Sequence, residues 1–290
     1  MTAATTTDIE TPAAAAVTTT TAPATAKPWH ARVRDSATYR AGQPAYDLVT
    51  SPWMSARMLL AVRVVLALWM ATWWTIEVFV TNGSGIAIFS YFTVLSYSGI
   101  LILSVTLAFL SYAYSRDPEA QALASATGVH TAVTYLFATA STNCLIVSPV
   151  YWLFLAPQYG VPSIQTADGL TNLSVHALNV AVMLIHWLTS SLVIGTWWLL
   201  VPVITTGVLY LIWALMWHAI NGKWVYGFLN PADKSSTYMY PAVIAAFFIM
   251  FAVVKGLLVL RTRVLGVSSV HAVRTQGQQS GKPAAVVVVA

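Results

Sequence analysis

The chain has 290 residues, of which 58% are hydrophobic and only 8% are charged. A single soluble core of this size cannot bury so many apolar side chains, so the composition excludes a soluble globular protein and indicates an integral membrane protein. The net charge of +5 does not indicate nucleic-acid binding, because the basic residues cluster beside apolar spans, where membrane topology accounts for them. The single cysteine, Cys144, excludes a disulfide within the chain.

Both ends of the chain differ in composition from its middle. The first 26 residues are rich in Thr, Ala and Pro and carry no basic residue, so they lack the features of a signal peptide and predict a disordered tail. The last residues end in a short valine run that is too short to cross a bilayer. We therefore expect disordered tails over residues 1–50 and 264–290, and a transmembrane domain over residues 51–263.

Six apolar windows come close to the roughly 20 residues that a helix needs to cross a bilayer. In chain order they cover residues 58–80, 88–114, 129–155, 173–194, 197–219 and 240–260. The sequence thus predicts an all-α, polytopic membrane bundle of about six transmembrane helices. Only Gly195 and Pro202 punctuate the fourth and fifth windows, so a single broken or re-entrant unit is the alternative interpretation there.

The basic residues predict an orientation for these spans. They flank the first and the last window as Lys27, Arg32, Arg34, Arg40, Arg57, Arg261, Arg263, Arg274 and Lys282. By the positive-inside rule both termini are expected in the cytoplasm, and the loops 81–85 and 156–172, which have no Lys or Arg, on the other side. Glycosylation sequons at Asn82 and Asn172 fall in these two loops. The chain is therefore predicted to be a multi-pass protein of an endomembrane or the plasma membrane.

Few ionisable residues fall inside the apolar windows, and each costs about 3 kcal/mol on insertion, so each is a functional candidate. They are Arg63, Glu77, His130, His176, His186, His218 and Lys255. Arg63 and Lys255 lie near cytoplasmic ends, where long stems can snorkel to the surface, which indicates a topological role for both.

Depth in the membrane brings four polar residues into one layer. Successive spans alternate in direction and each helical residue adds about 1.5 Å, so Glu77, Thr93, His176 and His218 are expected near the non-cytoplasmic surface. A threonine hydroxyl becomes a nucleophile when a base such as histidine takes its proton, which predicts acyl transfer at this layer. The alternative is that these side chains only form hydrogen bonds between helices.

The histidine spacing does not favour a metal site. His176 and His186 are ten residues apart, whereas two ligands on one helix face are three or four apart, so we expect no metal and no cofactor. A b-type haem between facing helices is the alternative, and its candidate ligands are His130, His176, His186 and His218.

Three segments together carry a resemblance to a known family. "YLIWALMWHAINGKWVYGFL" (residues 210–229) is the longest and most specific, "YFTVLS" covers residues 91–96, and "SVHALNVAVMLIHW" covers residues 174–187. The first resembles the penultimate-helix motif of the androgen-induced and androgen-dependent membrane hydrolases, which are related to the rolling stone proteins. The other two are similar to the segments around the catalytic threonine and the catalytic histidine of that family.

This resemblance implies a threonine hydrolase that cleaves fatty acid esters of hydroxy fatty acids in the membrane. Carried over by position, Thr93 would be the nucleophile and His176 its base. Relatives of the human proteins have two histidines three apart in this segment, but this chain has Leu173 and Asn179 on either side of His176. An alignment shifted by one turn would place Asn179 at the catalytic position.

Other residues could support this chemistry. Asn179, His218 and Trp224 could donate hydrogen bonds to an oxyanion, and Glu77 could orient an imidazole. The rival hypothesis is a non-catalytic membrane protein that acts in signalling, fusion or scaffolding, as the rolling stone resemblance allows. In that case Thr93 and His176 only pack helices together.

Overall fold

The computed structural model describes residues 46–81, 85–116 and 127–264. The predicted tails lie largely outside these ranges, and so does the sequon at Asn82. Within the predicted N-terminal tail, however, Tyr46–Val49 form the short helix α2, which buries Leu48 completely. The described residues thus include a short helix within the range that the sequence assigns to the N-terminal tail.

Six helices among the described residues are long and apolar enough to cross a membrane. Their bounds are Ala56–Val80, Phe92–Arg116, Gly128–Gln158, Ala167–Thr189, Trp197–Asn221 and Ser236–Val264. Each overlaps one predicted window, so the prediction of an all-α polytopic bundle is confirmed. The chain is a multispan helical membrane protein.

The first span begins at a well-formed cap. The Ser55 hydroxyl accepts the backbone N–H of Met58 at 3.3 Å, which satisfies one free donor at the start of α3 (Ala56–Ile76). The 21 residues of α3 include no Gly or Pro, so nothing interrupts the helix before its end. There α3 continues as the π-helical turn η1 (Glu77–Thr81).

The second span starts later than predicted. Residue 88 opens the predicted window, but Ile88 lies in the 3₁₀ helix η2 (Gly85–Ser90), and the transmembrane helix α4 is Phe92–Arg116. The two elements are equally apolar, so hydropathy alone could not separate them. The "YFTVLS" segment thus lies at the beginning of α4.

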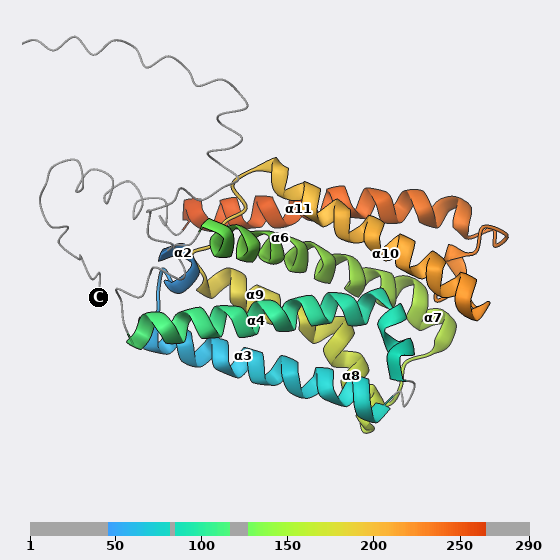
Figure 1. Cartoon of the computed structure of the whole chain (residues 1–290), viewed down its shortest axis with the longest axis horizontal. Coiled ribbons are helices and arrows are strands. Elements are labelled where there is room, and N and C mark those ends of the chain that lie inside the picture. The colour runs from blue at the N-terminus through green and yellow to red at the C-terminus, as the bar shows by residue number, and fades with distance from the viewer. Residues whose placement is uncertain (1–45, 82–84, 117–126, 265–290) are drawn as a thin grey trace, which may run out of the picture.

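The third span is the central helix of the bundle. It consists of α6 (Thr127–Val150), the π-helical turn η3 (Tyr151–Leu155) and α7 (Ala156–Tyr159). In its most apolar window 61% of the residues are buried inside the protein, against 17% in the fifth span. Figure 1 shows α6 running through the middle of the bundle.

The fourth span is a composite helix. It consists of α8 (Ala167–Leu173), the π-helical turn η4 (Ser174–Leu178) and α9 (Asn179–Thr189). It ends five residues before the predicted boundary at residue 194. Residues 190–196 form a non-helical segment, called the 190–196 linker below, which begins at Ser190 with extended dihedral angles (φ −94°, ψ 147°).

After the linker the fifth and sixth spans form a hairpin. The fifth span is η5 (Trp197–Leu199) followed by α10 (Leu200–Asn221), and the sixth is α11 (Ser236–Val264), with η6 (Gly227–Leu229) in the loop between them. The fourth and fifth spans are therefore separate helices.

The fifth and sixth spans approach each other closely. A Cβ atom at Gly207 of α10 would lie 2.7 Å from the Phe247 ring of α11, so glycine provides the space for that ring. In Figure 1, α10 and α11 line one edge of the bundle, and α3 and α4 line the opposite edge.

Successive spans run in alternating directions, so the bundle has two distinct ends (Figure 1). We call the end that holds α2, the start of α3 and the ends of α4 and α11 the α2 end. The opposite end, with α8, η1, η2 and the start of α4, is the α8 end. The α2 end corresponds to the predicted cytoplasmic side.

Candidate functional site

Three π-helical turns occur in the described residues, and all three lie toward the α8 end. They are η1 on the first span, η3 on the third and η4 on the fourth. Glu77 lies in η1 and His176 in η4, so two of the predicted site residues occupy π turns. Such turns are rare and occur frequently at functional sites, which marks this end of the bundle for closer inspection.

Thr93 lies in the first turn of α4 and is half-buried. It lies near the Tyr226 phenol, which comes from the loop after α10. The phenol oxygen also accepts the backbone N–H of Phe92 at 3.1 Å, a donor that the helix itself leaves without a partner. Tyr226 therefore joins the α10–α11 loop to the start of α4.

Burial raises the pKa of Tyr226, while the neighbouring Thr93 hydroxyl and the Phe92 N–H act in the opposite direction. Since the ordinary pKa of a tyrosine is about 10, this phenol is neutral at physiological pH. A neutral phenol can donate its proton in a hydrogen bond as well as accept one. It can therefore donate to an oxygen that gains negative charge near Thr93.

Two α10 side chains hold the turn that precedes Thr93. Tyr210 donates its phenol proton to the carbonyl of Ser90 at 3.1 Å, and the Trp213 indole donates to the carbonyl of Phe89 at 2.9 Å. Tyr210 and Trp213 are three residues apart and therefore share one helix face. The "YLIW" part of the motif thus fixes the chain just before α4.

The rest of the motif forms a tight chain reversal. Gly222 has a φ of 67° and its N–H bonds the carbonyl of His218 at 2.8 Å, which is a glycine cap at the end of α10. The reversal stacks the His218 imidazole on the Trp224 indole, with ring centroids 3.7 Å apart. These two predicted supporting residues are therefore brought together. Tyr226 follows two residues after Trp224, and the reversal brings it to the start of α4.

His176 is buried in η4 with 8% of its surface exposed. Its imidazole stacks on the Tyr151 ring of η3, with centroids 3.5 Å apart and an interplanar angle of 10°. Its Nδ1 atom is buried and has no hydrogen-bond partner in the described part of the chain. One turn earlier, Asn172 donates its side-chain amide to the Tyr151 hydroxyl at 2.6 Å, so the amide of this predicted sequon is engaged in packing.

Glu77 lies near a second pair of hydroxyl groups. The Tyr97 phenol and the Ser174 hydroxyl are 2.9 Å apart and join the second span to the fourth. The Glu77 carboxylate is close enough to Tyr97 to act on it electrostatically. Ser174 thus faces α4, whereas His176, two residues on, packs against the third span.

Asn179 begins α9 and is almost completely buried, with 1% exposed. Its side-chain oxygen accepts the N–H of Val180, the next residue, at 2.7 Å. The Asn179 side chain is therefore folded back on its own backbone.

Of the six predicted site residues, His218 and Trp224 are brought into contact. Thr93 lies near Tyr226 and Glu77 near Tyr97, whereas His176 packs on Tyr151 and Asn179 bonds its own backbone. No hydrogen bond joins Thr93 and His176 among the described residues, because each side chain has another packing partner. Sequence reasoning placed Tyr226 in the motif but gave it no role, since only the folded loop reveals its contact with α4.

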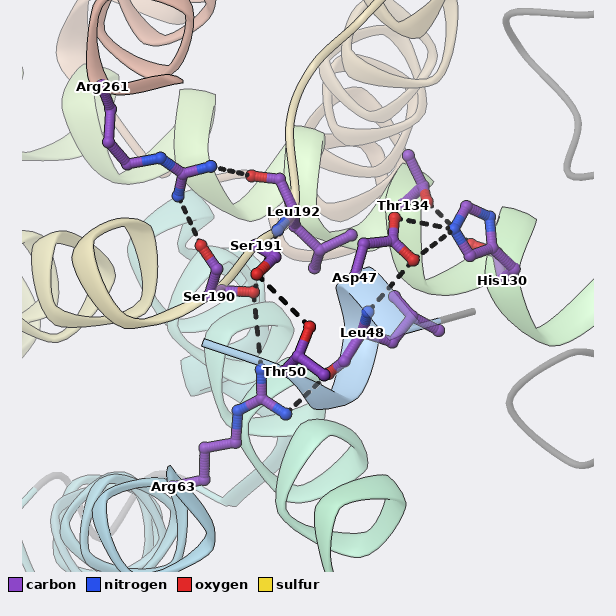
Figure 2. A network of polar contacts seen from close by, with 10 residues as sticks. All are labelled: Asp47, Leu48, Thr50, Arg63, His130, Thr134, Ser190, Ser191, Leu192 and Arg261. Atoms are coloured by element: carbon purple, nitrogen blue, oxygen red, sulfur yellow. Dashed lines mark hydrogen bonds and ion pairs between the residues drawn. The ribbon is translucent and has the colours of Figure 1, made fainter. Parts of the chain in front are cut away.

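The α2 end holds a second set of polar residues, and of these the sequence marked only His130 and His186 as candidate ligands (Figure 2). Arg63 is 0% exposed, so the expectation that its stem snorkels to the surface is wrong. Its guanidinium points inward and donates to the Leu48 carbonyl at 2.6 Å and to the Ser111 hydroxyl at 2.5 Å. A longer contact of 3.4 Å reaches the Ser190 hydroxyl at the start of the 190–196 linker.

Cations from α11 bind the carbonyl groups of the same linker. Arg261 donates to the carbonyls of Ser190 at 2.6 Å and Leu192 at 2.7 Å (Figure 2). It also donates to the carbonyl of Trp187. Lys255 donates to the carbonyls of Ile194 and Gly195 at 2.8 and 2.9 Å. A non-helical segment in a membrane needs such partners for its backbone, and these cations provide them.

Two histidines at this end have polar partners. His186 is fully buried and its Nε2 lies 2.9 Å from the Ser104 hydroxyl of α4, which joins the second and fourth spans. His130 forms an ion pair of 3.0 Å with Asp47 of α2 (Figure 2). These contacts hold helices together and attach α2 to the bundle.

The four histidines considered as haem ligands each pack against a different group, namely Asp47, Tyr151, Ser104 and Trp224. Among the described residues, no group of three or more His, Cys, Asp or Glu side chains could hold a metal ion.

Comparison of the chain with protein-family models, with curated proteins and with solved structures found no match. The resemblance to membrane threonine hydrolases therefore stays a prediction from the sequence.

Proposed function

We propose that this protein is a membrane-embedded hydrolase of lipid esters in which Thr93 is the nucleophile. The observation that carries the proposal is the hydrogen bond of 3.1 Å between the Phe92 N–H and the Tyr226 phenol, which places that phenol beside Thr93. It joins the start of α4 to a loop 134 residues away, and both segments belong to the motifs on which the family resemblance depends. The bond therefore places a phenol next to a threonine at the first turn of an apolar helix.

The position of Thr93 suits a nucleophile. The first turn of a helix carries the partial positive charge of the helix dipole, which favours negative charge on a nearby oxygen. The neutral Tyr226 phenol can donate a hydrogen bond to the carbonyl oxygen of an ester as that oxygen gains charge. Thr93 is only half-buried and lies in the first turn of its span, which we expect near the bilayer surface, where the ester groups of lipids lie.

His176 is the general base of the proposed reaction. It would take the proton of the Thr93 hydroxyl as this oxygen attacks the ester carbonyl, and would pass the proton to the departing alkoxide. Water would then hydrolyse the threonyl ester and release the carboxylic acid. Because the His176 ring is stacked on Tyr151, the base has to leave this stack or act through a water molecule. The proposed substrates are fatty acid esters of hydroxy fatty acids.

Covalent labelling of the purified protein with a fluorophosphonate probe tests the nucleophile. Thr93→Ala should abolish labelling and hydrolysis of a synthetic lipid ester, whereas Thr93→Ser should retain labelling. Thr72→Ala is the matched control, because Thr72 is exposed on α3 and its hydroxyl bonds only its own helix, at the Leu68 carbonyl. His176→Gln should slow hydrolysis by about 10²- to 10⁴-fold. If the probe labelled Thr93→Ala as strongly as the wild type, Thr93 would not be the nucleophile.

A non-catalytic role in signalling, fusion or scaffolding is the second candidate. It is favoured by the separate packing partners of Thr93 and His176, which is what side chains that only connect helices would have. Under this alternative the wild-type protein itself would not react with the probe, so the same labelling experiment distinguishes the two functions.

A further inference from the structure

The outer face of the first helical hairpin carries a groove between α3 and α4. Its volume is about 420 Å³, and its lining side chains are hydrocarbon apart from the Tyr112 hydroxyl. Three alanines, Ala67, Ala71 and Ala108, leave space that larger side chains would fill. Exposed side chains such as Val64 and Phe109 stand beside them as walls.

The length of the groove matches one leaflet of a bilayer. On α3 it extends from Leu60 to Ala71, and 11 residues of helix span about 16 Å. The hydrocarbon core of a bilayer is about 30 Å thick, so the groove covers about half of it. It begins near the α2 end, where Leu60 lies in the second turn of α3 and Tyr112 in the last turns of α4. A single acyl chain of the leaflet at that end has the matching length.

Each wall of the groove ends in an arginine. Arg57 lies three residues before Leu60 on α3, and Arg116 lies four residues after Tyr112 on α4, so each continues the stripe of side chains that lines the groove. Because the two helices are antiparallel, both arginines lie at the α2 end, and both are exposed. The Arg116 guanidinium lies over the Tyr112 ring, 5.8 Å from its centroid, directly at the mouth of the groove.

We propose that this groove is a binding site for an anionic phospholipid. One acyl chain lies in the groove, and the phosphate lies between Arg57 and Arg116. Inside a membrane an apolar groove gains little from exchanging one acyl chain for another, because the surrounding lipid is equally apolar. Selection therefore depends on the two guanidinium groups, which favour an anionic headgroup.

Native mass spectrometry of the purified full chain in detergent tests the headgroup part of this proposal. Titration with phosphatidylglycerol and phosphatidylcholine gives the dissociation constant of the first bound lipid for each. The wild type should prefer phosphatidylglycerol. One arginine near a membrane surface changes the dissociation constant of an anionic lipid about fivefold. The double variant R57Q/R116Q should therefore weaken phosphatidylglycerol binding about 25-fold and leave phosphatidylcholine binding unchanged.

The single variants R57Q and R263Q form a matched pair, because each removes one exposed positive charge at the α2 end and only Arg57 lies on the groove stripe. R57Q should weaken phosphatidylglycerol binding about fivefold and R263Q less than twofold. Equal losses in the two variants would overturn the site, because they would indicate attraction to the whole charged surface.

Filling the groove tests the acyl-chain part. Ala71→Phe places a ring in the far end of the groove, so binding of long-chain phosphatidylglycerol should weaken several-fold, whereas a short-chain form with six-carbon acyl chains should bind as before. Unchanged long-chain binding in a correctly folded Ala71→Phe protein would overturn the proposal. The proposal would also be overturned if the wild type showed the mass of a dimer and Ala71→Phe abolished that dimer without affecting lipid binding. In that case a second copy of the chain, and not a lipid, would occupy the groove.

Discussion

The two ends of the bundle use buried polar groups in different ways. At the α2 end the cations donate to backbone carbonyls, and His186, although its Nδ1 lacks a partner, is bonded through its Nε2 to Ser104. At the α8 end the rings of His176 and His218 are stacked on aromatic side chains, and their Nδ1 atoms have no hydrogen-bond partner among the described residues. The α2 end also has buried polar atoms without a partner, namely Nε of Arg63 and of Arg261. The difference between the two ends therefore lies in the kind of group that each buried side chain contacts, which its depth in the membrane does not reveal.

The largest effect is expected from the α2 end, where the polar groups are structural. Arg63→Ala leaves the Leu48 carbonyl and the Ser111 hydroxyl without their donor and removes the contact to Ser190. We expect it to lower the free energy of unfolding by about 3 to 5 kcal/mol, because several buried groups lose a charged partner at once. Unfolding of the purified protein in detergent with increasing dodecyl sulfate measures this change.

Arg263→Ala is the control for this measurement, because Arg263 is an exposed arginine at the same end. It should change the free energy of unfolding by no more than about 0.5 kcal/mol. A loss below about 1 kcal/mol for Arg63→Ala would mean that the 190–196 linker does not depend on the buried cation, and the contrast between the two ends would fail.

A smaller effect is expected at the α8 end. Tyr226→Phe removes the acceptor of the Phe92 N–H and should cost about 1 kcal/mol of unfolding free energy. Because burial raises the pKa of Tyr226 in the folded state, its contribution is fully present below the unfolded pKa of about 10 and is lost as the pH rises further. The wild type should therefore lose stability above about pH 10, and Tyr226→Phe should lose less.

Unfolding midpoints measured between pH 8 and 11 test this dependence. Tyr238→Phe is the control for the loss of a phenol, because Tyr238 is exposed on α11, and it should change the free energy of unfolding at neutral pH by no more than about 0.5 kcal/mol. Identical slopes for Tyr226→Phe and the wild type would contradict a buried phenol at the start of α4. If catalysis uses this phenol, the same variant should also slow ester hydrolysis at neutral pH by about 10²-fold.

The membrane fold was predictable because hydropathy and span length are local properties. Six windows of about 20 apolar residues are sufficient to predict six helices, and all six are present in the described residues. The predicted helix boundaries were wrong where a non-α-helical segment is as apolar as the neighbouring transmembrane helix. The segment around Ile88 is apolar but forms a 3₁₀ helix. Residues 192–194 are apolar but non-helical, and Arg261 and Lys255 bind carbonyls of this segment.

The candidate site was predictable only in part, because a sequence gives the depth of a residue but not the direction of its side chain. Depth placed His176 and Thr93 near the same end of the bundle. It did not reveal that the His176 ring packs on Tyr151 while the Thr93 hydroxyl meets Tyr226, since both contacts join segments that are distant in the sequence. Arg63 was misinterpreted for the same reason, because its long side chain turns inward to Leu48 instead of outward to the surface.

The smallest expected effect concerns the Ser104–His186 pair, which tests whether a serine and a histidine at hydrogen-bond distance inside the membrane have a purely structural role. Hydrogen bonds between transmembrane helices contribute on average about 0.6 kcal/mol, with a maximum of about 1.7 kcal/mol. A double-mutant cycle with Ser104→Ala and His186→Leu should give a coupling energy in this range, and Ser104→Ala should label with the fluorophosphonate probe as the wild type does. If Ser104→Ala lost labelling and Thr93→Ala kept it, the nucleophile would be Ser104 and not Thr93. The Ser104 hydroxyl and the His186 Nε2 are 2.9 Å apart, which is the separation of a nucleophile and its base.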